Sequence, residues 1–316
     1  MKLAYEPRAS TILYNLLVES SDHRPFLLPA NICPIVPITF LKAGVPFTFV
    51  DISPVTLHID LTDATNLLGT GRFGGLVYVH TYGEASTPDD FFASLKTADP
   101  TLLLIDDRCL CIPEFESDLP SQADVILYST GNSKIADLDF GGYAFLRDEV
   151  AYRRHSIPFH PEDLEAVEKI YKRSITSRQR FIYRDCDWLE TEADLPEWDV
   201  YRQHTEAARA DALEQRRRIN ALYTECLPGE ILLPAEYQTW RFNLQLPRRD
   251  ETLAAIFKAG LFASAHYTSL AGILAPGACP NAEQFADQVI NLFNDHHFTL
   301  EMAEKVCDII LKNMKK

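Results

Sequence analysis

The chain has 316 residues, 47% hydrophobic and 24% charged, which is typical of a globular protein with a large core and room for two domains. Its formal net charge is −15 and its isoelectric point lies near 5.0. We therefore expect no nucleic-acid partner, because binding along a phosphate backbone requires clustered Lys and Arg. No apolar run reaches the roughly 18 to 20 residues of a membrane span, and the start lacks a secretory signal's apolar core. These features predict a cytoplasmic protein with no membrane contact.

Seven cysteines are scattered along the chain. Without an export signal, they are expected to be reduced thiols rather than a disulfide framework. Cys109 and Cys111 are the only close pair, and no second Cys or His pair stands at zinc spacing, so no metal site is predicted.

The first predicted helix covers residues 10–19, where apolar side chains recur at helical spacing. Ser10 is a candidate N-cap, which would place free backbone N–H groups and the positive end of the helix dipole at Ser10 and Thr11. A phosphate group could bind there, although a simple capped helix accounts for the same residues.

Short apolar runs then alternate with helical segments. The predicted strands are 26–29, 47–51, 75–80, 102–106, 123–128 and 143–146, and the predicted helices are 34–43 and 88–96. This alternation indicates an α/β protein whose mostly parallel sheet is covered by helices on both faces. Several of these strands end in polar residues, and ligands bind at the carboxyl ends of such strands, so the sequence predicts a pocket at that edge.

Asp106 and Asp107 end one of these strands. Because adjacent strand residues point to opposite sides, only one of the two is expected to face a ligand. Lys134 lies on a loop between two strands, where Gly131 and Gly141 let the backbone approach a flat ligand closely. Taken alone, the loop is better explained by an ordinary surface lysine at Lys134.

The loop lysine and the strand-end aspartate together suggest an aldehyde cofactor. Pyridoxal phosphate needs a lysine for its Schiff base, a carboxylate that keeps the pyridine nitrogen protonated, and a cradle for its phosphate. The chain contains candidates for all three.

In their order, these motifs resemble the DegT/DnrJ-type nucleotide-sugar aminotransferases, which have the aspartate aminotransferase fold of pyridoxal-phosphate-dependent transferases (fold type I). In that family a serine lies five residues before the Schiff-base lysine and a Gly-Gly pair begins seven residues after it. Ser129, Lys134 and Gly141-Gly142 keep both spacings. Residues 79–83 and 105–107 are similar to the family's His-x-Tyr/Phe-Gly turn and acidic pair, and residues 282–301 to its final helix, strand and helix.

The resemblance implies roles for individual residues. Lys134 would form the Schiff base and transfer protons, and Asp107 would pair with the pyridine nitrogen. Ser129 would hold the phosphate together with Ser10 and Thr11. The family transfers an amino group from an amino acid such as glutamate to a keto sugar or another small keto substrate, and its members are homodimers.

Three positions depart from the family pattern. The glycine of its phosphate loop corresponds to Ala9, and the broad side chain that stacks on the cofactor ring corresponds to Cys33. The Gln or His that contacts the ring hydroxyl corresponds to Leu110, which cannot donate a hydrogen bond. Two alternatives follow: a degenerate or repurposed pyridoxal-phosphate-binding protein without transaminase activity, and a lyase or dehydratase.

Residues 1–198 are expected to form the large cofactor-binding domain, and residues 199–316 a connector helix and a small α+β domain. Helical spacing marks residues 161–171 and 202–226, residues 230–233 and 240–246 are candidate strands, and a helix is predicted near 250–259. The basic run Arg216-Arg217-Arg218 stands between acidic residues and is predicted to be solvated or to form an interface.

Arg241 and His266 are candidates to face the site, where an arginine could grip a substrate carboxylate. The alternative is that Trp240 belongs to the core and that His266 is a loop histidine with satisfied hydrogen bonds.

Overall fold

A seven-stranded sheet forms the base of the molecule in a computed structural model that describes residues 1–116 and 121–315. Its strand order is β1-β7-β6-β5-β4-β2-β3. The strands are β1 (Lys2–Glu6), β2 (Phe26–Pro29), β3 (Phe47–Val50), β4 (Gly75–Val79), β5 (Leu103–Asp107), β6 (Val125–Ser129) and β7 (Gly142–Leu146). The five from β2 to β6 run parallel, whereas β7 and β1 are antiparallel to their neighbours. The predicted α/β architecture with a mostly parallel sheet is therefore confirmed.

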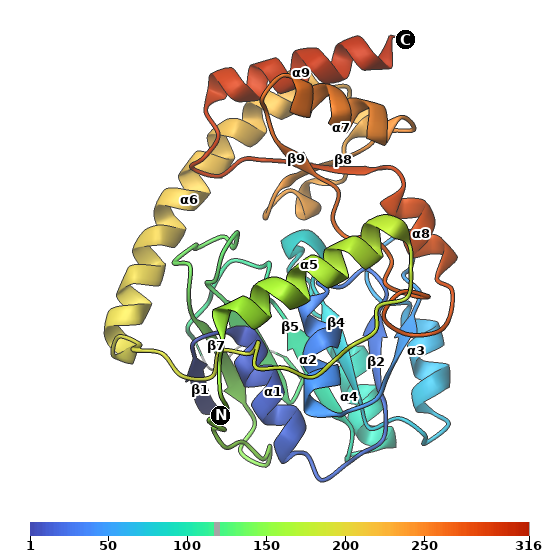
Figure 1. Ribbon diagram of the computed structural model, residues 1–316, viewed down its shortest axis with the longest axis vertical. Helices are drawn as coiled ribbons and strands as arrows, with labels where there is room; N and C mark the ends of the chain where they lie inside the picture. The colour runs from blue at the N-terminus through green and yellow to red at the C-terminus, as the bar shows by residue number, and fades with distance from the viewer. Residues whose placement is uncertain (117–120, 316) are drawn as a thin grey trace.

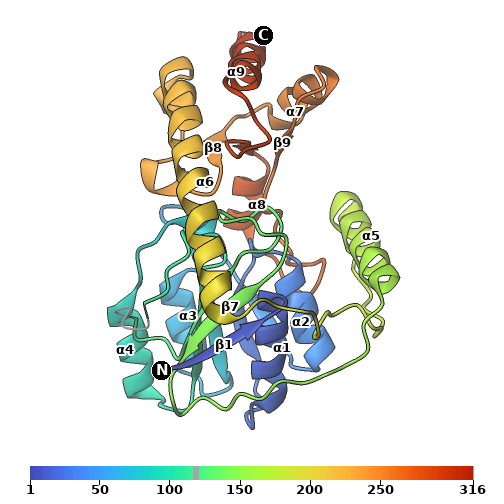
Figure 2. The same cartoon turned by 90° about the vertical axis from the view of Figure 1, so that its left-hand side faces the viewer.

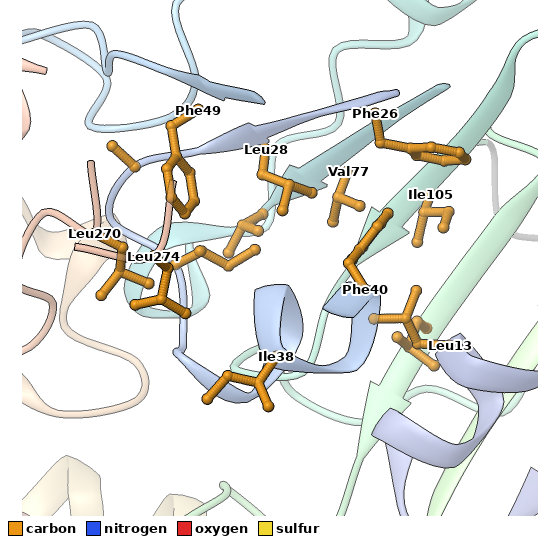
Figure 3. Packing of buried hydrophobic residues seen from close by; sticks show 14 of the residues in the cluster. Leu13, Phe26, Leu28, Ile38, Phe40, Phe49, Val77, Ile105, Leu270 and Leu274 are labelled. Carbon is orange, nitrogen blue, oxygen red and sulfur yellow. The ribbon is translucent and has the colours of Figure 1, made fainter. Parts of the chain in front are cut away.

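Helices cover both faces of this sheet (Figure 2). On one face lie α1 (Ala9–Glu19) and α2 (Ile35–Ala43), and on the other α3 (Leu61–Leu68) and α4 (Asp89–Ala98). In the core that α1 and α2 share with the strands, the rings of Phe26 and Phe40 meet edge to face with centroids 5.3 Å apart (Figure 3). Leu270 and Leu274, from far along the chain, pack into the same core (Figure 3). The C-terminal half is thereby tied to the large sheet.

The second half of the chain contains two long helices and a smaller sheet. α5 (Pro161–Ser177) lies in front of the large sheet in Figure 1 and stands apart to one side, beyond α1 and α2, in Figure 2, whereas α6 (Trp198–Cys226) runs along one side up to the smaller sheet. The smaller sheet is antiparallel, in the order β8-β10-β9, and is covered by helices. Its elements are β8 (Phe242–Gln245), α7 (Arg249–Lys258), β9 (Ala263–Ser264), β10 (Val289–Leu292) and α9 (Leu300–Met314), with α8 (Pro280–Ala286) before β10. None of the helices in the described part of the chain has both the length and the apolar character that a membrane span requires.

Two predictions about local structure are wrong. Residues 230–233 do not form a strand, because a short 3-10 turn (Gly229–Ile231) occupies them and only Leu232 makes an isolated bridge to Leu244. Proline residues, which cannot donate to a ladder, bracket this segment. Ser10 is not the N-cap of the first helix: α1 begins at Ala9, and the extended residue before it is Arg8.

Candidate active site

The loop that carries Lys134 follows β6 and has its own internal hydrogen bonds. The backbone N–H of Lys134 donates to the carbonyl of Gly131 at 3.2 Å. The carboxylate of Asp137 accepts from the backbone N–H groups of Ser133 and Asp139 at 2.7 and 3.0 Å. Ser133 takes a positive φ of 60°, which a non-glycine residue adopts only where its surroundings enforce it. The loop is thus a defined structure that fixes the backbone position of Lys134.

Two residues from later in the chain hold this loop from the outside. The indole Nε1 of Trp240 donates to the carbonyl of Ser133 at 2.7 Å. The guanidinium of Arg216, on α6, donates to the carbonyls of Lys134 and Ile135 at 3.3 and 3.4 Å, and to that of Trp240 at 3.3 Å. The lysine loop is therefore tied both to the connector helix and to the start of the small sheet.

Arg216 is only 5% exposed, so of the two alternatives for the basic run, solvated or at an interface, solvation does not hold for this residue. Burial lowers the pKa of Arg216 to about 10. Its spacing from Ile219 and Tyr223, both buried on the same face of α6, is the signal in the sequence that could have revealed this.

Asp106 and Asp107 point to opposite sides at the end of β5, as the alternation of a strand predicts. Asp106 is completely buried and accepts from Nε2 of His80 at 2.5 Å and from Nε of Arg108 at 2.9 Å. Burial alone would raise the pKa of Asp106, but the contacts with His80 and Arg108 outweigh it and hold that pKa below its usual range. Asp107 accepts from the backbone N–H of Cys109 at 2.9 Å and also hydrogen-bonds the Cys109 thiol.

Asp107 and Lys134 both act electrostatically on the thiols of Cys33 and Cys109. Burial raises the pKa of Cys33, the Lys134 ammonium opposes this shift, and the Asp107 carboxylate adds to it. Cys109 shows the same pattern: burial and Asp107 raise its pKa, and Lys134 lowers it. The fold thus brings together three of the predicted site residues, Lys134, Asp107 and Cys33, and adds Cys109, which the sequence did not single out.

The start of α1 lies beside the end of β6. Ser129, the last residue of β6, pairs in register with Gly142. A Cβ atom on Gly142 would lie 2.3 Å from the backbone nitrogen of Ala9, so only glycine lets α1 approach this closely. The close packing of α1 therefore requires a glycine at position 142. It also places Ser10 and Ser129 at the same end of the sheet.

The two hydroxyl groups predicted on α1 differ in their surroundings. Thr11 is buried, its hydroxyl donates to the carbonyl of Glu190 at 2.6 Å, and its N–H donates to the carbonyl of Arg8 at 3.1 Å. For Ser10, which is half-buried, no side-chain hydrogen bond to the described residues is recorded. Of the two, Ser10 is therefore better placed to offer hydrogen bonds to a ligand.

Aromatic rings and Arg241 lie beside the lysine loop on the side of the small sheet. Trp240 is buried and stacks between Tyr82 and Tyr267, with ring centroids 6.2 Å away on each side. Arg241 pairs with Asp295 at 3.2 Å. The His266 ring lies 5.9 Å from that of Trp240, and burial lowers the pKa of its imidazole to about 4. Trp240 thus belongs to the core, as one of the two predictions for this region stated.

This arrangement of strands and helices has counterparts among solved structures. No protein-family model and no curated protein matches the chain in sequence. Among solved structures, it matches a DegT DnrJ EryC1 StrS aminotransferase from Brucella abortus with a TM-score of 0.70 and 15% identity, covering 100% of this chain and 87% of that one.

Two further solved structures are similar. PseC of Helicobacter pylori, an aminotransferase involved in the biosynthesis of pseudoaminic acid, has a TM-score of 0.70 and 15% identity over 99% of this chain and 86% of that one. The aminotransferase TlmJ from Streptoalloteichus hindustanus has a TM-score of 0.69 and 18% identity, with coverages of 99% and 87%. At these identities the likeness shows a common fold over nearly the whole chain, and the predicted resemblance is confirmed at that level.

Proposed function

We propose that this chain is a pyridoxal-phosphate-dependent aminotransferase that moves an amino group from an amino acid such as glutamate to a keto sugar or another small keto substrate. The observation that carries the proposal is that Asp107 ends β5 and Lys134 follows the end of β6, at the carboxyl edge of the parallel strands, and that both charges act on the thiols of Cys33 and Cys109. In a fold shared with aminotransferases, this lysine and this carboxylate are the pair that the cofactor requires.

The residues present fit the cofactor at both ends. Asp107 is buried and, unlike Asp106, has no cationic partner among the described residues, so its carboxylate is available to a protonated pyridine nitrogen. Ser129 and the start of α1 would hold the phosphate, with Ser10 contributing more than Thr11. Cys33 would lie against the ring in place of a broader side chain. Leu110 is buried and offers no side-chain donor, so the ring hydroxyl would have no partner from that position.

In this proposal Lys134 has two tasks: its Nζ binds the cofactor covalently, and the same amine moves the proton on the carbon that gains or loses the amino group. The bound cofactor supplies an electron sink for the negative charge that forms at that carbon. The internal bonds of the loop, together with Trp240 and Arg216, would keep the lysine backbone fixed while its long side chain moves.

The proposal includes a homodimer. Ile170 on α5 and Ile182 just after that helix are 50% and 73% exposed, and such apolar side chains would be covered in an assembly of two copies. Sedimentation of the purified protein measures this directly, and a monomer at all concentrations would refute that part of the proposal.

Mixing the purified protein with pyridoxal phosphate tests the cofactor assignment. We expect the visible absorbance band of a lysine-bound cofactor, which Lys134→Ala abolishes and the matched change of an exposed lysine on α5, Lys169→Ala, leaves in place. A wild-type protein without this band would refute the cofactor assignment. Glutamate or another amino donor should bleach the band. A stable band that no donor bleaches would refute transamination and leave a cofactor-binding protein.

A further inference from the structure

The side chain of Arg8 extends from the start of α1 to the beginning of the lysine loop. A Cβ atom on Gly131 would lie 3.7 Å from Nη1 of Arg8 and 3.6 Å from the hydroxyl oxygen of Ser129. The guanidinium and the hydroxyl thus both lie within 4 Å of one point, which the absence of a side chain at Gly131 leaves unfilled. Figure 2 shows the elements that meet there, with α1 beside β7.

Only part of the Arg8 guanidinium is engaged. Its Nε donates to the carboxylate of Glu190 at 2.9 Å, and Nη1 donates to the carbonyl of Asp139 at 2.5 Å. A guanidinium has five N–H donors, so three have no acceptor among the described residues. The Arg8 side chain is 36% exposed and therefore accessible to a ligand. The bond to Glu190 fixes the orientation of the guanidinium and leaves its other N–H donors available.

Ser129 adds a second group with unused hydrogen-bonding capacity. It is only 9% exposed, and its oxygen accepts from the N–H of Gly131 at 3.3 Å, but its hydroxyl proton has no acceptor in the described part of the chain. The first turn of α1 contains no acidic residue, so nothing there offsets the positive end of the helix dipole. A guanidinium, a buried hydroxyl and a helix start with unused donors together suit a phosphate dianion.

We propose that Arg8 binds the phosphate of the cofactor, a role that rests on the proposed function and extends it to a residue for which the resemblance implies no role. The guanidinium would grip two phosphate oxygens through its fork, while Ser129 donates to a third. The Cβ atom of Ala9 limits how closely the backbone can approach the phosphate. The Arg8 guanidinium would supply contacts to the phosphate in place of those backbone groups. Glu190 would keep the fork in place in the absence of ligand.

Comparing pyridoxal phosphate with pyridoxal, which lacks the phosphate, isolates this contact. Both aldehydes can bond to Lys134, so absorbance titrations give a dissociation constant for each, independent of turnover. We expect Arg8→Gln to weaken pyridoxal phosphate binding about tenfold to hundredfold, as for the loss of a charge-assisted pair, and to leave pyridoxal binding unchanged. Arg8→Lys keeps the positive charge but lacks the forked guanidinium. Its affinity for pyridoxal phosphate should therefore fall between those of the wild type and Arg8→Gln. Arg217→Gln, an exposed arginine that also pairs with a glutamate, is the matched control.

The outcomes separate this proposal from the one on which it rests. If wild-type protein bonds neither aldehyde through Lys134, the cofactor assignment itself is wrong. If wild-type protein binds both but Arg8→Gln leaves the ratio of the two dissociation constants unchanged, or weakens both aldehydes equally, Arg8 does not contact the phosphate. Should Arg8→Gln fail to fold, the ratio measured for Arg8→Lys decides in the same way.

Discussion

A substitution at Arg216 should disturb the order of the lysine loop while it leaves the overall stability of the protein nearly unchanged. The change Arg216→Met removes the guanidinium and keeps a long apolar side chain on α6. The four carbonyls that Arg216 now contacts, including that of Ala212 on its own helix, lose a donor. We expect the free energy of unfolding to change little, while the loop that carries Lys134 opens more often.

Two opposing terms lead to this expectation. The four hydrogen bonds are long, at 3.3 to 3.4 Å, so each contributes roughly 0.5 to 1 kcal/mol, about 2 to 4 kcal/mol together. Against this, burial lowers the pKa of Arg216 from 12.5 to about 10. Below pH 10 the folded state carries the cost of that buried charge, about 3 kcal/mol, which methionine avoids. The net loss of stability should therefore not exceed about 2 kcal/mol.

The loop responds differently. It loses the hydrogen bonds to the carbonyls of Lys134 and Ile135, and removal of the buried Arg216 charge does not stabilise the loop in return. Hydrogen–deuterium exchange at the amides of residues 134 and 138 should become about tenfold faster, which corresponds to about 1.4 kcal/mol of local stability. Urea unfolding gives the global value. The next residue, Arg217, is exposed and pairs with Glu214, so Arg217→Met is the matched control and should change neither quantity. A global loss above about 4 kcal/mol, or unchanged exchange in the loop, would refute this reasoning.

Two further predictions concern the fold. Gly142→Ala would place a Cβ atom 2.3 Å from the nitrogen of Ala9 and should destabilise the protein by about 1 to 3 kcal/mol, whereas Gly229→Ala, with no atom within 4 Å of its Cβ position, should not; equal melting temperatures would contradict this. Burial and the nearby His80 lower the pKa of His58 to about 3. The unfolded chain therefore takes up the proton first, and stability should fall as the pH drops from about 6.5 towards 3, by roughly 3 kcal/mol given the opposing Glu84 carboxylate at 3.5 Å. In urea unfolding between pH 7 and 4, His58→Phe should flatten this decline; curves parallel to the wild type would show that His58 is not its source.

Much of the architecture could be predicted from local patterns. The predicted strands 26–29 and 47–51 correspond closely to β2 and β3. Their apolar runs and the glycine and proline residues around them are features of neighbouring residues, so they can be read without knowing the rest of the fold. The spacing of Ser129, Lys134 and the glycine pair is of the same kind.

The partners of these elements depended on the tertiary structure. In the sequence, Arg216 belongs to a basic run that is predicted to be solvated or to form an interface. Only the packing of α6 against the lysine loop shows that Arg216 is buried. The sequence predicts Ser10 as a helix cap. In the structure α1 already begins at Ala9, which packs closely against Gly142. The donors left unused on Arg8 become visible only when its guanidinium is seen beside Ser129 and Gly131.

By itself, the sequence determined the class of fold, the order of its elements and the lysine and aspartate that stand at strand ends, because hydrophobic periodicity and short spacings are local properties. Only the tertiary structure decided which charges are buried, where α1 begins and which side chains surround Lys134. Those features depend on contacts between segments far apart in the chain, such as Arg8 with Asp139 and Glu190. Their free energies come from desolvation and pairing at contact distance, which no local pattern records.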